Sequence, residues 1–99
     1  MLFSITWDMY PATKAACFKA FANMTVEDDE KDSGPEVRIV GRWSHVGGGS
    51  GVCICETESS EALFSWMANW ADVCDIKVTP VLEDAPCRAI LKSKQSEES

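Results

Sequence analysis

The chain has 99 residues, of which 45% are hydrophobic and 25% charged, and this is enough to build the core of one domain without disulfides or metals. The formal net charge of −7 argues against binding to nucleic acid, because phosphate-backbone sites are built from clustered Lys and Arg. No apolar run approaches the roughly 18 residues needed to cross a bilayer, so we expect no membrane partner.

The start of the chain and the cysteines indicate a compartment. The stretch from Met1 to Asp8 has no basic start and meets an acid early, so we expect no secretory signal. Five cysteines, an odd number, are spread through apolar segments. We therefore expect a cytoplasmic protein with reduced, buried thiols.

The first half of the chain predicts a strand, a helix and a loop. Residues Leu2 to Asp8 alternate in polarity, which is typical of a strand. Residues Lys14 to Met24 carry apolar side chains at helical spacing. The stretch from Thr25 to Glu36 holds six acids that repel one another, so it predicts a mobile acidic loop. It lacks the ligand spacing and the glycine of a calcium-binding EF-hand loop.

A glycine-rich reversal at mid-chain predicts a hairpin. Val37 to Val46 and Gly51 to Thr57 form its two strands, and the single histidine, His45, lies at the tip. The loop is longer than a two-residue turn, so turn type does not fix the register. Pairing of residues on the same face would place Arg42 opposite Glu56, His45 near Cys53 and Trp43 near Cys55.

The second half predicts a helix, a strand and a short terminal helix. Glu58 to Glu61 contains a Ser cap and acids suited to a helix start. An apolar stripe follows at helical spacing, made of Leu63, Trp66, Met67 and Trp70. Asp75 to Leu82 is a strand that Pro80 confines to a sheet edge. Ala85 to Lys92 predicts a short helix.

The order of these elements is β-α-β-β-α-β, which predicts a ferredoxin-like α+β fold with both helices on one face of a four-stranded antiparallel sheet. Residues 1–92 form the single domain, and residues 93–99 form a disordered polar tail. We expect the helices to cover Phe3, Ile5, Trp7, Val37, Ile39, Trp43, Cys53, Cys55, Ile76 and Val78. The opposite face mixes Leu2, Val40, Val52, Ile54 and Val81 with Ser4, Thr6, Arg38, Arg42, Glu56, Lys77 and Thr79. Such a surface predicts a homodimer, sheet against sheet.

Several short motifs resemble the DUF3303 family of short, mainly bacterial domains. They are Met1-Leu2-Phe3 with Thr6-Trp7, the hairpin strand Gly41-Arg42-Trp43, the glycine turn, the second helix with its tryptophans, and Val78-Thr79-Pro80-Val81-Leu82. The resemblance covers most of residues 1–84 except the acidic stretch. It implies the dimeric α/β-barrel fold, whose relatives include monooxygenases, dehydratases and isomerases, and it implies no particular function.

In one respect this chain departs from that family. Family members often carry a histidine directly after the tryptophan, whereas here Ser44 follows Trp43 and the histidine is His45. In a strand, one residue of displacement turns a side chain to the other face.

The candidate site is a pocket between the sheet and the second helix. We expect it to be lined by Trp7, Trp43, His45, Trp66, Trp70 and Arg42. His45 is the candidate catalytic acid or base, or else a half-exposed residue at a hairpin end. Arg42 either clamps a ligand carboxylate or pairs with Glu56, and the tryptophans either surround a cavity or fill a solid core.

The sequence indicates no metal and no cofactor. Cys53 and Cys55 share one strand face, but zinc sites usually need four ligands, and no second pair of cysteines or second histidine is present. The glycine loop lacks the Lys and helix start of a phosphate-binding loop.

Two functions remain open. The first is a homodimeric domain that binds a small apolar or aromatic ligand, either as a binding protein or as a cofactor-free enzyme. The alternative is a non-catalytic dimerisation or protein-interaction module with a solid core. Whether the protein is an enzyme stays open at this point.

Overall fold

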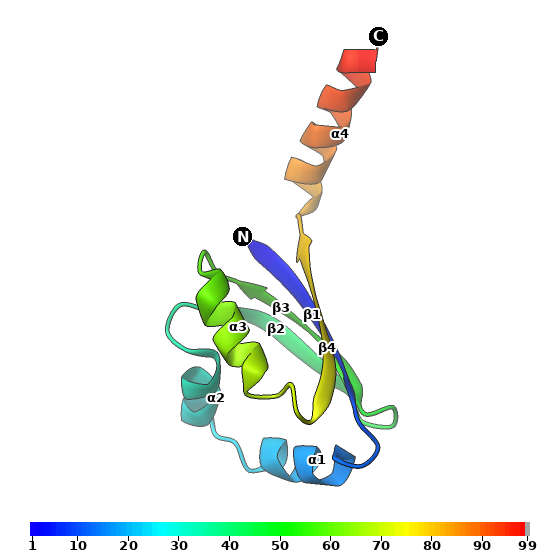
Figure 1. The fold of residues 1–99 in the computed structure, drawn as a ribbon. Coiled ribbons are helices and arrows are strands. Elements are labelled where there is room, and N and C mark those ends of the chain that lie inside the picture. Colours follow the sequence, from blue (N-terminus) through cyan, green and yellow to red (C-terminus); the bar gives the residue numbers. More distant parts are fainter. Residues whose placement is uncertain (99) are drawn as a thin grey trace.

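Four strands form one antiparallel sheet in the computed structural model, which describes residues 1–98 (Figure 1). They are β1 (Leu2–Met9), β2 (Arg38–His45), β3 (Ser50–Glu56) and β4 (Cys74–Val81), in the spatial order β2-β3-β1-β4. Every neighbouring pair is antiparallel. The predicted ferredoxin-like arrangement is confirmed, and β4 is an edge strand, as its proline indicated.

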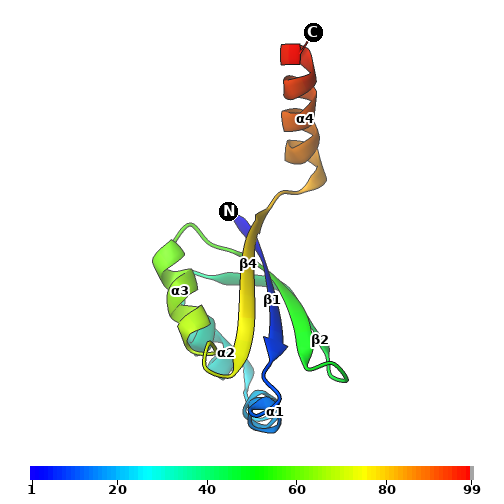
Figure 2. The ribbon, with the colours of Figure 1, turned by 45° about the vertical axis from the view of Figure 1, so that its right-hand side comes forward.

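Three helices lie to one side of this sheet, namely α1 (Lys14–Ala22), α2 (Val26–Ser33) and α3 (Ser60–Ala68). Figure 2 shows α2 and α3 beside one face, α1 at the end of the sheet, and no helix over the opposite face. The start of α3 is fixed by Ser59, whose Oγ accepts a hydrogen bond of 3.1 Å from the backbone N–H of Ala62. We call the face that no helix covers the outer face.

The core lies between the sheet and α3. It is built from Ile5, Val37, Cys53, Cys55, Leu63 and Trp66. Cys53 and Cys55 are almost fully buried and act as small apolar side chains at the centre of the sheet. Four of the five cysteines are buried and all five are free, whereas Cys87 is exposed and corrects the expectation that every thiol is buried.

A β-bulge in β2 changes which side chains face the helices. The pairing of β2 with β3 shifts register between Ile39 and Gly41, so that Arg42 lies opposite Cys53 and Trp43 opposite Val52. Because Cys53 faces the helices, Arg42 does too, and Trp43 faces the other way.

The pairs expected from simple alternation are therefore wrong. Glu56 lies opposite Arg38, with 3.4 Å between Nη2 and Oε2, and His45 lies opposite Ser50. Both Trp43 and His45 belong to the outer face, and Arg42 belongs to the helix-facing side. A strand that alternates without interruption would give the reverse, and the extra residue at the bulge is the reason.

The acidic stretch from Thr25 to Glu36 is not a loop over most of its length, because residues 26–33 form α2. The helix begins with a capping box, in which Thr25 Oγ1 accepts from the N–H of Asp28 and the Asp28 carboxylate accepts from the N–H of Thr25. These bonds to Thr25 lower the pKa of Asp28. Three acids in the first turn also suit the positive end of the helix dipole.

The C-terminal helix α4 (Asp84–Glu98) is longer than expected and stands away from the sheet (Figure 1). The expected polar tail, residues 93–99, is helical as far as Glu98, so the expectation of disorder is wrong there, and Ser99 lies outside the described residues. The side chains of residues 84–96 are exposed throughout. Among residues 1–98, no helix is long and apolar enough to cross a membrane.

Two tryptophans lie directly against glycines of the sheet. The indole of Trp7 covers Gly51 on the helix-facing side, and the indole of Trp43 covers Gly41 on the outer face. A Cβ atom at either glycine would overlap the ring. These positions therefore need glycine for the close approach of an aromatic side chain.

We expect Thr25→Ala to lower the free energy of unfolding by about 1 kcal/mol, because the first turn of α2 loses a side-chain acceptor. Urea denaturation at pH 7 measures this difference. Val26→Ala, at the neighbouring exposed position, is the control and should change stability much less. Equal effects of the two substitutions would contradict the capping role of Thr25.

Candidate functional site: a cavity between the sheet and the helices

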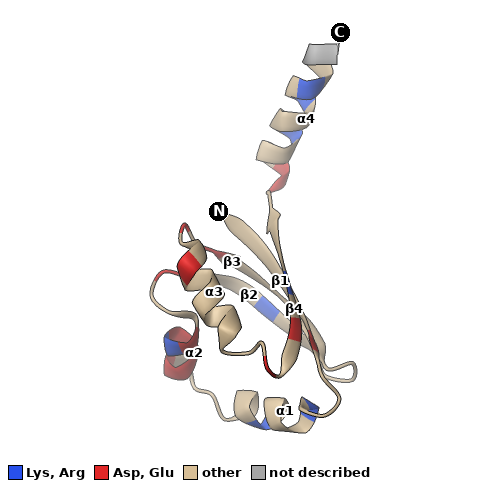
Figure 3. Ribbon diagram, in the orientation of Figure 1, with Lys and Arg blue, Asp and Glu red and all other residues tan. Residues whose placement is uncertain are grey.

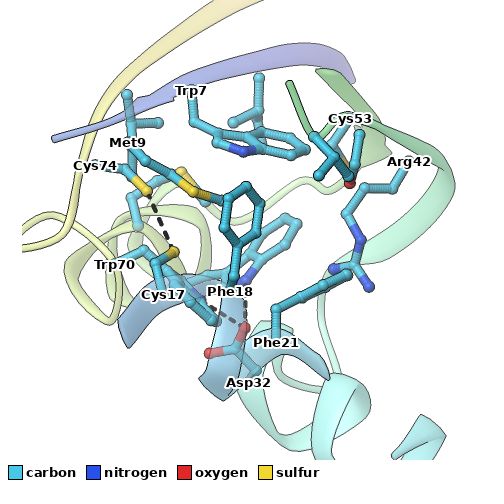
Figure 4. Close-up of a pocket in the computed structure, with 16 residues that line it drawn as sticks. Trp7, Met9, Cys17, Phe18, Phe21, Asp32, Arg42, Cys53, Trp70 and Cys74 are labelled. Atoms are coloured by element: carbon cyan, nitrogen blue, oxygen red, sulfur yellow. Dashed lines mark hydrogen bonds between the residues drawn. The ribbon is translucent and has the colours of Figure 1, made fainter. Parts of the chain in front are cut away.

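The structure contains a cavity of about 160 Å³ between the helix-facing side of the sheet and helices α1 and α3 (Figure 4). Strand β1 contributes Ile5, Trp7 and Met9 to its wall, and α1 contributes Cys17, Phe18 and Phe21. Trp66 and Trp70 close the side formed by α3 and the turn after it. Five aromatic rings thus surround a space that these side chains do not fill.

Asp32 of α2 is held at the wall of this cavity by three donors. Its Oδ2 accepts hydrogen bonds from Nε1 of Trp66 at 3.0 Å and from Nε1 of Trp70 at 2.7 Å, and its Oδ1 accepts from Nδ2 of Asn69 at 3.0 Å. The donors are spaced at i, i+3 and i+4, so they project from one side of the α3 segment. One carboxylate therefore attaches α2 to α3 and orients both indoles.

Arg42 enters the same wall from β2. Its Nη2 lies 3.0 Å from Oδ1 of Asp29, and its guanidinium lies over the ring of Phe21 at 4.8 Å. The expected pair with Glu56 does not form, because the bulge places Arg42 on the helix-facing side. An arginine that is already paired with a carboxylate and stacked on an aromatic ring is a structural link between β2, α1 and α2.

Two thiols of the cavity wall, Cys53 and Cys74, are poor nucleophiles. Burial, reinforced by the neighbouring Cys17, raises the pKa of Cys74 to about 12, and the two sulfur atoms lie 3.9 Å apart. Burial also raises the pKa of Cys53 to about 11, with a smaller contribution from Cys55. Thiolates, which are the reactive form, are thus disfavoured. Within residues 1–98, no group of three His, Cys, Asp or Glu side chains is placed to hold a metal ion.

The structure brings four of the six expected site residues together at this cavity. Trp7, Arg42, Trp66 and Trp70 line it. Trp43 and His45 do not, so their expected place in the pocket is wrong. Trp43 is 60% exposed on the outer face, and His45 is exposed at the end of β2, with Nδ1 3.4 Å from Oγ of Ser50. The bulge turns both residues outward, and the alternation of polar and apolar residues along the strand does not reveal it.

Sequence reasoning missed Asp32 and the wall formed by α1. The run of acids around Asp32 predicts a mobile loop, whereas Figure 3 shows this run as the strongly acidic helix α2. One local signal was present: Thr25 and Asp28 have the spacing of a capping box, which favours a helix start. Nothing local indicates that the next acids meet an arginine and two indoles.

The chain belongs to the DUF3303 family, described as a domain of unknown function, whose model matches residues 1–95. The resemblance seen in the sequence is thereby confirmed. No match is found among curated protein sequences.

Solved structures provide distant similarities. Rv0793 from Mycobacterium tuberculosis is 15% identical, with 85% of this chain and 97% of that chain covered and a TM-score of 0.48. Atu4242 from Agrobacterium tumefaciens is 16% identical, with coverages of 87% and 98% and a TM-score of 0.47. A NIPSNAP domain protein from Burkholderia xenovorans is 11% identical, with coverages of 87% and 99% and a TM-score of 0.46. At these sequence identities and TM-scores, the similarities support no conclusion about the function of this chain.

We expect one thiol per folded chain to react rapidly with a thiol reagent such as iodoacetamide at pH 8, because Cys87 is exposed and the other four cysteines are buried. Mass spectrometry of the modified protein identifies the site. The variant Cys87→Ser should show no fast phase. Rapid modification of Cys53 or Cys74 would contradict their raised pKa values and their burial.

Proposed function

We propose that this protein binds a small apolar or aromatic ligand in the cavity between its sheet and its helices. The observation that carries the proposal is an unfilled space of about 160 Å³ within an aromatic wall. An engineered cavity of about 150 Å³ in another protein accepts benzene, which indicates the size of ligand that fits.

The proposal is for binding, and it assigns no reaction. Nucleophilic or acid–base catalysis requires a reactive group next to the ligand. Cys53 and Cys74 of the wall have raised pKa values, and His45, the candidate catalytic residue, projects from the opposite face of the sheet. The part of the wall that the structure describes therefore favours retention of a ligand over its conversion.

The protein is further proposed to act as a homodimer that pairs through the outer face. Successive cross-strand rows there place Trp43 beside Val52, Gly41 beside Ile54, and Leu2 beside Val81. Val40 and Trp43 are 50% and 60% exposed in the single chain. Contact with a second outer face would remove these apolar groups from water. In a dimer with a two-fold axis, one interface would bury the same surface on both copies.

A second candidate is a protein-interaction module without a ligand. Exposed apolar side chains outside the sheet favour it, notably Ile90 and Leu91 on α4. It accounts for these surfaces, but it gives no role to the cavity. Ligand binding is therefore the function that we favour.

Blocking the cavity tests the binding function. Ser44 lines the cavity from β2, and we expect Ser44→Trp to abolish the rise in melting temperature that a small aromatic probe such as toluene or indole gives the wild type. His45→Trp places the same indole side chain at the next residue, which faces away from the cavity, so it should keep the probe-induced rise. A wild type that no probe stabilises, or two variants that behave alike, would contradict the proposal.

We expect Trp43→Glu to convert a dimer into a monomer in sedimentation experiments at micromolar concentration, because it places a charge beside Val52 on the outer face, where the interface would have to bury it. Phe64→Glu is the matched control, since Phe64 is 75% exposed on α3 and lies away from that face. A wild type that already sediments as a monomer would contradict pairing through this surface.

A further inference from the structure

We infer that the ligand of the cavity is a cation, namely a small aryl- or alkylammonium whose charged group lies against the carboxylate of Asp32 and whose apolar part lies among the aromatic rings. The inference rests on the binding function proposed above and narrows its ligand class. Three observations support it: the charges at the wall, the unused acceptor capacity of Asp32, and the aromatic composition.

The charges at the wall do not cancel. Asp32 and Arg42 are the charged residues among the described residues that line the cavity. The positive charge of Arg42 is matched by Asp29, with 3.0 Å between Nη2 and Oδ1. Asp32 has no cationic partner within residues 1–98, and its three hydrogen-bond donors are neutral. One negative charge at the cavity therefore remains uncompensated.

Asp32 retains room for one more donor. An ionised carboxylate has about four acceptor positions, and three are occupied here. The Trp66 and Trp70 indoles fix the position of the carboxylate, so a ligand would find it in place. An ammonium N–H would fill the remaining acceptor position and would also supply the missing positive charge. A neutral ligand could fill that position with a donor, but it would leave the charge of Asp32 uncompensated.

The rest of the wall also suits a cation. Figure 4 shows Phe18 between Trp7 and Asp32, and Phe21 beside Asp32 on the side of Arg42. Aromatic rings attract cations through their quadrupoles, and cages of aromatic side chains recognise alkylammonium groups. The net charge of −7 raises the local concentration of cations around the whole chain.

An anionic ligand fits the same cavity poorly. It would meet the uncompensated charge of Asp32, and the guanidinium that could hold it is occupied by Asp29 and stacked on Phe21 at 4.8 Å. The pair Asp29–Arg42 thus acts as a selectivity element, because it removes the one cation of the wall from reach.

Three probes of similar shape test the inference: benzylammonium, benzyl alcohol and benzoate, measured by calorimetric titration at pH 7 and low salt. The wild type should bind benzylammonium about tenfold more tightly than benzyl alcohol, and benzoate least. Equal affinity for the cation and the alcohol would overturn the inference and leave the binding function standing. Absence of binding by all three would overturn both.

Two variants locate the selectivity. Asp32→Asn should bring the affinity ratio of benzylammonium to benzyl alcohol to about one, since the amide keeps an acceptor oxygen and loses the charge. Glu30→Gln removes one charge from an exposed position of the same helix and should keep the wild-type ratio. An equal fall of the ratio in both variants would show general electrostatic attraction and overturn the assignment to Asp32.

A third variant keeps the test decisive if Asp32→Asn fails to fold. Asp29→Asn leaves Asp32 unchanged and frees Arg42 from its partner. It should weaken benzylammonium and strengthen benzoate, so that the ratio of their affinities falls by about tenfold. An unchanged ratio would overturn the role given to the pair Asp29–Arg42 and, with it, the charge argument.

Discussion

The hydrogen bonds that the carboxylate of Asp32 accepts are the contacts on which the arrangement of α2, α3 and the cavity depends. The carboxylate accepts from the indoles of Trp66 and Trp70 and from the amide of Asn69, and so it attaches α2 to α3. Without this attachment, an exposed helix of eight largely acidic residues would have little to hold it, since short isolated helices are marginal in water. The same contact fixes two of the rings around the cavity, so the fold of α2 and the shape of the site have one cause.

A second constraint is the bulge in β2. By inserting one residue between Ile39 and Gly41, it turns Arg42 toward the helices and turns Trp43 and His45 outward. Arg42 can then meet Asp29, which gives α2 its second attachment. The bulge thus separates the two sides of one strand: its helix-facing side lines the cavity in which we propose a ligand, and its outer side belongs to the surface proposed for dimerisation.

These two constraints explain why the cavity persists. Trp66 and Trp70 are held by Asp32 and Trp7 by its contact with Gly51, so these rings are not free to collapse into the space between them. The buried thiols of Cys53 and Cys74, whose pKa values are raised, form part of a wall that is apolar apart from Asp32, Arg42 and Ser44. The charged side chains of this wall, Asp32 and Arg42, are the groups to which we assign the discrimination between ligands.

The sequence by itself determined the ferredoxin-like order, the edge position of β4, the apolar stripe of α3 and the family, because these follow from local periodicity, from proline chemistry and from short motifs. Only the tertiary structure decided that the acidic stretch forms a helix, on which side of the sheet Arg42, Trp43 and His45 lie, and which residues line the cavity. The physical reason is distance along the chain: Asp32 is stabilised by residues more than thirty positions away, Arg42 by one 13 positions away, and a bulge leaves the local polarity pattern unchanged.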